Sequence, residues 1–243
     1  MRTLLAQFRY EQRSYWRSPL SVVSSIGFTP IFIFLIAGVT GETGGALQRF
    51  LPGVVTISAM SICVTGVAVN LSYRRDQNIL KRFYATPVSP WTILVGVVLS
   101  ATLTTLVVAL ASVAFVATAL DVHLAVGVAS LLAGVALLSF ALAWLGCALS
   151  AVPSQSVVAV ANLVVFPALF VSGTMFPLDD SVWYAQAGRL LPPYFARQLV
   201  APALGVDLGG TTPAASLAGL AAWALVAAVV GARTFRWNSA AVR

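Results

Sequence analysis

The chain has few side chains able to do chemistry, and their positions exclude the common catalytic and nucleotide-binding sites. Its one lysine, Lys81, follows Leu80, so no G-x-x-x-x-G-K-[ST] phosphate-binding loop exists. Its one histidine, His123, lies in a short predicted turn, where too few other ligands are available to hold a metal ion. No G-x-S-x-G nucleophile string occurs either. We therefore expect no catalytic residue, no metal site and no cofactor bound by this chain.

Polar side chains inside the apolar segments are the remaining candidates for function. Asn70, Asn162 and Ser172 are expected to lie along a substrate path. For Asn162, a hydrogen bond between helices is the favoured alternative, because buried amides often join membrane helices. No Asp, Glu, Lys or Arg is predicted deep in the membrane, which argues against a carrier driven by protons or sodium ions. The chain is thus expected to conduct or carry a substrate without an energy source of its own.

Two long stretches without formal charge indicate which elements position these residues. No Asp, Glu, Lys or Arg occurs between Arg82 and Asp121, or between Asp121 and Asp179. Overall, 59% of the residues are apolar and 9% are charged, against about 25% charged in soluble domains. Hydrocarbon cannot solvate charged groups, so this composition predicts an all-α integral membrane protein. Because the loops are short, residues 1–243 are expected to form one transmembrane domain.

Apolar segments and their polar borders predict six transmembrane helices. Residues 1–18 come first and carry arginines beside a face of apolar and aromatic side chains, as in an amphipathic helix that lies in the membrane interface. Pro153, flanked by Ser150 and Ser154, divides a segment that is too long for one crossing. Short re-entrant helices are expected at the outer surface between the fifth and sixth spans. The six spans are expected at about residues 19–39, 50–71, 91–120, 125–149, 156–175 and 213–232.

The basic residues predict the orientation of these spans. Eleven of the 14 lie on one expected face: four in the N-terminal helix, four in residues 73–90 and three in the C-terminal tail. Five of the seven acidic residues lie on the other face. Since basic residues favour the inner side, both termini are expected in the cytoplasm. The turn at Pro153 has no basic residue and does not follow this rule. Clusters at membrane edges do not indicate a nucleic-acid partner.

Three short segments resemble motifs of one known family. Residues 80–89, LKRFYATPVS, resemble the L-K-R-L-x-A-T-P-V-S cytoplasmic loop of ABC-2 type permeases, and Asp76 matches the acidic residue before it. Residues 170–177, FVSGTMFP, are similar to the family's S-G-x-x-F-P at the outer end of the fifth span. Residues 191–195, LPPYF, match an Asn-Pro plus aromatic motif, except that Pro192 replaces the asparagine. The three segments occur in family order along the six-span layout, which covers the whole chain.

The resemblance implies the transmembrane subunit of a bacterial ABC exporter, in the style of the daunorubicin-resistance permeases. A separate ATPase subunit would bind ATP and Mg, and a second permease chain, the same or different, would complete a dimer in the plasma (inner) membrane. The path would lie between the two permeases, lined partly by spans 2 and 5. A drug, antibiotic or lipid is the expected cargo, since the spans lack charge. Coupling to the ATPase would involve Arg74, Arg75, Asp76, Lys81, Arg82 and Phe83.

Other interpretations of the sequence remain open at this point. Anchoring by positive charge at the inner membrane surface explains Arg74 and Arg75 as well as ATPase docking does. It explains less well the short helix that ends at Thr86-Pro87. A self-sufficient membrane carrier and a membrane-embedded enzyme are the alternative functions, and neither has a motif in this sequence.

Overall fold

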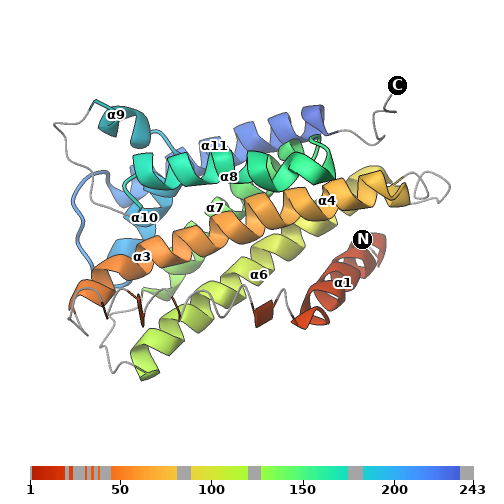
Figure 1. Cartoon of the computed structure of the whole chain (residues 1–243). Coiled ribbons are helices and arrows are strands. Elements are labelled where there is room, and N and C mark those ends of the chain that lie inside the picture. The colour runs from red at the N-terminus through yellow and green to blue at the C-terminus, as the bar shows by residue number, and fades with distance from the viewer. Residues whose placement is uncertain are drawn as a thin grey trace.

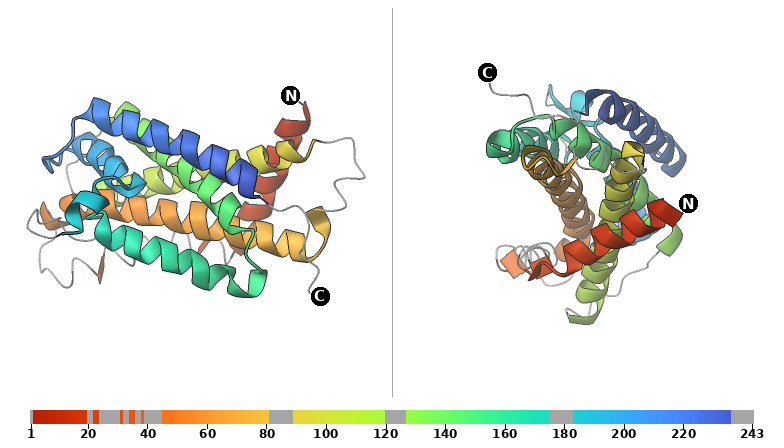
Figure 2. Two further views of the ribbon diagram at one scale, coloured as in Figure 1. Left: turned by 90° about the horizontal axis from the view of Figure 1, so that it is seen from above. Right: turned by 90° about the vertical axis from the view of Figure 1, so that its right-hand side faces the viewer.

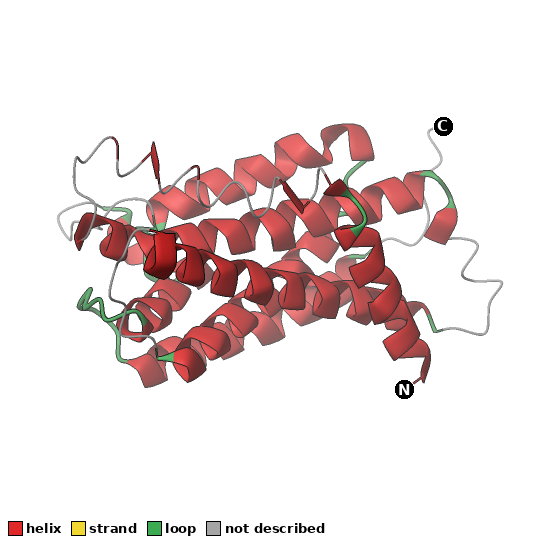
Figure 3. Cartoon of the chain, turned by 90° about the horizontal axis from the view of Figure 1, so that it is seen from below, coloured by secondary structure: helices red, strands yellow, loops and turns green. Residues whose placement is uncertain are grey.

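The structure is all-helical in the parts of the chain that it describes. This computed structural model describes residues 2–19, 22–23, 31, 34–35, 38, 45–80, 89–119, 127–174 and 183–235. Those ranges contain helices and turns but no strand (Figures 1 and 3). The helices are α1 Arg2–Trp16, α3 Gly45–Met60, the π-helix η1 Ser61–Gly66, α4 Val67–Asp76, α6 Pro90–Ala119, α7 Val128–Leu149, α8 Ser154–Val171, α9 Ala185–Gly188, α10 Pro192–Ala203 and α11 Pro213–Thr234.

Five helices in the described ranges are long and apolar enough to cross a membrane. They correspond to the second to sixth predicted spans. Of the predicted first span, 19–39, only residues 19, 22–23, 31, 34–35 and 38 are described, so this span is not tested. The helix predicted at 50–71 continues to Asp76, because α3, η1 and α4 run on without a break. The five helices are Arg49–Asp76, Trp91–Thr118, Val128–Leu149, Ser154–Val171 and Pro213–Thr234.

Prolines mark several of the helix starts. Pro90 begins α6 after Ser89, and Pro213 begins α11 after Thr212, whose Oγ1 accepts a hydrogen bond from the Ala215 amide at 3.3 Å. Proline suits the first helical position because the amide it lacks would have no partner inside the helix. Pro153 likewise directly precedes α8, so the charge-free segment from Asp121 to Asp179 is divided between α7 and α8.

Two short helices occupy the loop before α11. They are α9, with four residues, and α10, with twelve, and both are too short to cross a bilayer of about 30 Å at about 1.5 Å per residue. Helix α10 is mostly buried and packs against α3, α7 and α11. Whether either helix enters the membrane from outside stays a prediction.

Helix α7 is the centre of the bundle. It packs against α11, α6, α10 and η1, and Figure 2 shows α11 running alongside it. Its buried face is rich in small side chains, which allow neighbouring backbones to come close. At Gly146 a side-chain Cβ would meet the carbonyl oxygens of Cys63 and Val64 in η1. At Gly231 of α11, a Cβ would meet the Trp144 carbonyl oxygen at 2.5 Å.

The charged ends of several helices meet at one end of the bundle. Helix α1, the C-terminal ends of α4 and α11, and the turn between α7 and α8 lie there, while α9 and α10 lie at the other end (Figure 1). Helix α1 crosses α6 at this end and does not extend the bundle lengthwise (Figure 2). Its contact with α6 makes α1 part of the folded domain. Its location in a membrane interface stays a prediction.

We predict that Gly146→Ala lowers the free energy of unfolding by about 1–3 kcal/mol, because the added methyl overlaps the η1 backbone. The matched control is Gly66→Ala, whose Cβ would meet only the Ser61 carbonyl oxygen, at an ordinary 3.6 Å. Unfolding is measured by titrating the purified chain in mild detergent with dodecyl sulfate and following its helical circular dichroism. Equal stability of the two variants would contradict the close approach of α7 and η1.

Candidate functional site

The C-terminal end of α4 joins three other helices through consecutive charged residues. Arg74 contacts α1, while Arg75 and Asp76 contact the turn between α7 and α8. All three were predicted from the sequence to couple the chain to an ATPase. The structure adds contacts that these residues make within the chain itself.

Arg74 forms a two-pronged ion pair with Glu11 of α1. Its Nη1 and Nη2 lie 2.6 and 2.8 Å from Glu11 Oε1 and Oε2, and the two side chains are 13% and 5% exposed. Gln7 Nε2 donates a further hydrogen bond to Glu11 Oε1 at 2.6 Å. The Arg74 guanidinium also lies 5.9 Å from the centre of the Tyr10 ring. Bidentate pairs of this kind fix orientation as well as distance, so the pair sets the position of α1 on α4.

A second polar contact holds α1 on α6. Gln12 Nε2 lies 2.9 Å from both the carbonyl oxygen and the Oγ of Ser100, and 3.3 Å from Thr104 Oγ1. Its Oε1 accepts a hydrogen bond from Trp16 Nε1 at 2.8 Å. The sequence predicted that the apolar face of α1, on which Gln12 lies, contacts the membrane interface. In the structure, Gln12 on this face hydrogen-bonds to α6.

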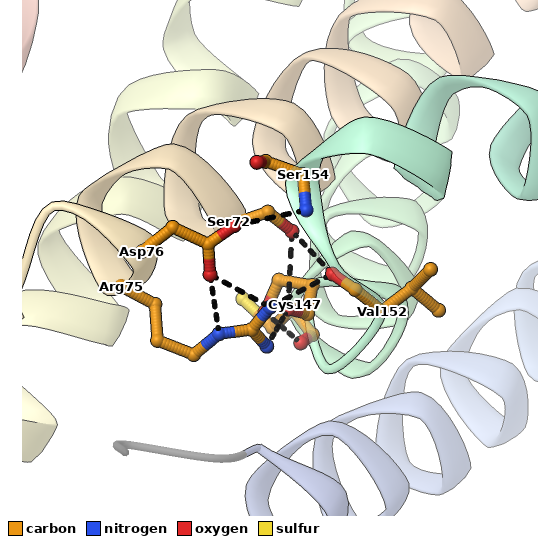
Figure 4. A network of polar contacts seen from close by, with 7 residues as sticks. Ser72, Arg75, Asp76, Cys147, Val152 and Ser154 are labelled. Carbon is orange, nitrogen blue, oxygen red and sulfur yellow. Dashed lines mark hydrogen bonds and ion pairs between the residues drawn. The ribbon is translucent and has the colours of Figure 1, made fainter. Parts of the chain in front are cut away.

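Arg75 is buried, 5% exposed, and donates to the backbone at the C-terminal end of α7 (Figure 4). Its guanidinium binds the carbonyl oxygens of Ser150 and Val152, the second at 2.9 Å. Ser72 Oγ donates to the same two oxygens, at 3.0 and 3.1 Å. Carbonyls at a helix C-terminus lack partners within the helix and carry partial negative charge. A cation and a hydroxyl from α4 therefore satisfy them.

Asp76 binds the start of the next helix. Its Oδ2 accepts a hydrogen bond from the Ser154 amide at 3.0 Å, while its Oδ1 lies 3.3 Å from Arg75 Nε and Nη2 (Figure 4). Pro153, the residue before α8, supplies no side-chain cap. A carboxylate is favourable at a helix N-terminus, where amides are unpaired. Arg75 and Asp76 thus bind the end of α7 and the start of α8, each through the charge that suits it.

A cavity of about 680 Å³ opens between α1, the η1–α4 segment and α6. The two faces of η1 differ: Cys63 and Val64 are buried, whereas Ser61 and Gly66 are exposed and line the cavity. Single π-helical turns inside α-helices are frequent at functional sites. The walls of the cavity combine polar side chains, most of them with hydroxyl groups, with aliphatic ones. They are formed by Tyr10, Glu11, Ser14, Tyr15, Ser18, Ser61, Ile62, Thr65, Gly66, Val67, Val69, Asn70, Tyr73, Arg74, Val97, Ser100, Ala101 and Thr104.

The three predicted path residues lie in different surroundings. Asn70 is exposed on α4 and lines the cavity. Asn162 is half-buried on α8, and Ser172 is buried just after α8, where its Oγ lies 2.7 Å from Thr174 Oγ1. Within the described ranges, neither of these two residues lines the cavity that Asn70 lines. Three of the predicted coupling residues, Lys81, Arg82 and Phe83, lie outside the described residues.

The sequence analysis did not assign Glu11, Gln12, Ser72 or Ser150 to the site. Two signals pointed to part of it. Glu11 is the one acidic residue in α1, among several arginines, so an ion pair with a basic residue elsewhere was a reasonable inference. The turn after Leu149 has no charged residue of its own, so charged partners from another helix were also a reasonable inference.

Arg197, on α10, is a further partly buried charge, at the other end of the bundle from Arg75. Its Nε has no hydrogen-bond partner in the described part of the chain. Burial lowers the pKa of the Arg197 guanidinium, and the electrostatic interaction with Tyr194 opposes this shift. Arginine stays protonated at neutral pH even so. In the described ranges no group of three or more His, Cys, Asp or Glu side chains is placed to hold a metal ion.

Helices of this length and composition, packed around α7, define a multi-pass membrane protein. The family described as ABC-2 type transporter matches residues 2–201, from the start of α1 into α10. The chain therefore belongs to the ABC-2 type transporter family, whose members are transmembrane permease components that generally lack an ATPase site of their own. No curated protein matches the chain significantly.

We predict that Arg75→Leu lowers the free energy of unfolding by about 2 kcal/mol, because charge-assisted hydrogen bonds at the end of α7 are lost. Arg9→Leu is the matched control: Arg9 is exposed on α1, and its loss should change stability by about 0.5 kcal/mol or less. Dodecyl sulfate titration in mild detergent measures both. A loss in Arg75→Leu no greater than in the control would contradict the role of Arg75.

We also predict that Arg74→Glu loosens α1, since the substitution sets two carboxylates against each other at a position with little solvent. The charge swap that combines it with Glu11→Arg should restore the contact, with a coupling energy of about 1–3 kcal/mol between the two positions. Hydrogen–deuterium exchange of the α1 amides reports the effect. Faster exchange in the swapped chain than in Arg74→Glu alone would show that this pair does not hold α1.

Proposed function

We propose that this chain is the permease subunit of an ATP-driven exporter, of the daunorubicin-resistance type, which moves an apolar or amphipathic molecule out of the cytoplasm. The observation that carries the proposal is the family match over residues 2–201 on a bundle of membrane-length helices. The cargo is a drug, an antibiotic or a lipid. The chain lies in a bacterial inner membrane with both termini in the cytoplasm.

Energy comes from a separate ATPase subunit, which binds ATP and Mg. Permeases of this family normally partner with such a subunit, and the only lysine of this chain is not in a phosphate-binding loop. The docking segment carries Lys81, Arg82 and Phe83 and directly follows the buried Leu80. The position of Arg74, Arg75 and Asp76 just before it supports a division of roles. These three residues hold α1, α7 and α8, while the following residues contact the ATPase.

The distribution of charged residues supports a substrate path that is lined by uncharged side chains and suits an apolar or amphipathic cargo. In the five membrane-length helices, the described charged side chains lie near helix ends: Arg49, Arg74, Arg75, Asp76 and Arg233. A second permease chain completes the route. Helix α8 presents large exposed apolar side chains to such a partner or to lipid, among them Leu163, Phe166 and Phe170 at 74%, 54% and 53% exposure.

The proposal is tested by purifying the tagged chain from its native membranes in mild detergent and identifying its partners by mass spectrometry. We predict a stoichiometric subunit with a phosphate-binding loop. The double variant Lys81→Glu, Arg82→Glu should recover roughly tenfold less of it, because two docking charges are reversed, while still inserting and folding. ATP-dependent transport should fall with it.

Arg9→Glu combined with Arg233→Glu is the control, since it makes the same change of charge at exposed residues outside the docking segment. Equal loss of the ATPase in both double variants would sink the docking assignment. Wild-type chain without any ATPase would favour a self-sufficient carrier or a membrane-embedded enzyme.

A further inference from the structure

Two neighbouring hollows share one wall on α1. The larger is the 680 Å³ cavity between α1, η1–α4 and α6. The smaller, of about 480 Å³, is lined by Arg13 and Arg17 together with Tyr10, Ser14 and Ser18, and the last three also line the larger one. The two hollows therefore adjoin along α1, with a basic section on one side and a mixed section on the other.

The larger hollow is suited to an apolar body. Its walls include Ile62, Val67, Val69, Val97 and Ala101, from both sides of the space between η1–α4 and α6. Hydroxyl groups, Asn70 and the Glu11–Arg74 pair form most of the rest of the lining, so aliphatic surface for an apolar body lies beside polar groups that could bind its polar atoms. A volume of 680 Å³ falls within the range of about 300–1,000 Å³ that small-molecule sites occupy.

The smaller hollow is suited to an anion. Arg13 lies in the last turn of α1, and Arg17 directly follows the helix, with its amide donating to the Arg13 carbonyl oxygen at 3.1 Å. This spacing of four residues brings the two side chains to the same side, and both are exposed. Neither forms an ion pair within the described residues. The one acid of α1, Glu11, is already paired with Arg74 and does not neutralise them. Guanidinium groups bind phosphate, sulfate and carboxylate through paired hydrogen bonds.

We propose that the two hollows together bind one anionic amphiphile, with its headgroup on Arg13 and Arg17 and its apolar body between η1–α4 and α6. The site lies within a single chain, and its larger hollow includes Asn70, one of the predicted path residues. Binding there requires neither ATP nor an ATPase, so the inference stands or falls independently of the proposed transport function.

Native mass spectrometry of the purified full-length chain tests the site, with phosphatidylglycerol as the probe. We expect one tightly retained molecule. Inorganic phosphate, which lacks the apolar body, and phosphatidylcholine, which lacks net charge, should not displace it. Arg13→Gln combined with Arg17→Gln should weaken retention about tenfold or more, because the charge-assisted hydrogen bonds to the headgroup are lost. The Glu11–Arg74 pair stays intact in this variant, so α1 remains docked.

Two further variants separate the site from general attraction of a basic helix to anionic lipid. Arg9→Gln with Arg233→Gln removes the same charge outside both hollows and should retain the probe as the wild type does. Gly66 is exposed in the larger hollow, so Gly66→Leu fills that hollow and should weaken retention of the probe as strongly as the arginine variant does. Its control is Ala222→Leu, at an exposed position of α11. Three results would each overturn the proposal. The first is equal weakening in the two arginine double variants, the second is displacement of the probe by inorganic phosphate or phosphatidylcholine, and the third is unchanged retention in Gly66→Leu.

Discussion

Hydrocarbon does not solvate charge, and this constraint decides where the helices of this chain are held together. In the membrane-length helices that the structure describes, charged side chains lie near the helix ends, so the ionic and charge-assisted contacts of these helices are confined to those ends. At one end, α4 finishes in three consecutive charged residues. Arg74 reaches α1, and Arg75 and Asp76 reach the turn between α7 and α8 (Figure 4). Within the rest of the bundle, contact depends on shape. The small residues of α7 allow close backbone packing, because a bilayer supplies little hydrophobic drive between helices.

The Arg75–Asp76 pair also explains how a turn without charges of its own is stabilised. The last carbonyls of α7 are bound within the turn itself, whereas the carbonyls of Ser150 and Val152 and the amide of Ser154 are bound from α4. Such backbone groups need partners where water is excluded. Arg75 supplies the donor and Asp76 the acceptor, so one dipeptide satisfies two helix ends of opposite polarity. Arg75 also brings a positive charge to the turn at Pro153, the one turn that lacked a basic residue in the orientation argument.

One face of the π-helix packs against α7, and its other face borders the cavity. Its backbone lies against Gly146 of α7, while Ser61 and Gly66 on the opposite side remain exposed and line the cavity. The ion pair at Arg74 and the hydrogen bonds of Gln12 hold α1 across that cavity. A movement of α4 would therefore change both its contacts with the turn between α7 and α8 and the shape of the cavity between α1, η1–α4 and α6. Under the proposed docking of an ATPase just after Leu80, these elements would be the first to respond.

The sequence alone determined the class of the molecule, because its evidence is local and compositional. Charge-free stretches, proline-marked helix starts and the ABC-2 motifs are readable without coordinates, and they led to helical membrane spans and to the family. The partners of Arg75 were not readable. They are backbone carbonyls some 75 residues away, and a carbonyl has no sequence signature. The π-helix and the cavity likewise depend on how η1 packs against α7 and how α1 crosses α6. Only the tertiary structure decides such contacts, since they are set by the close approach of distant segments and not by residue type.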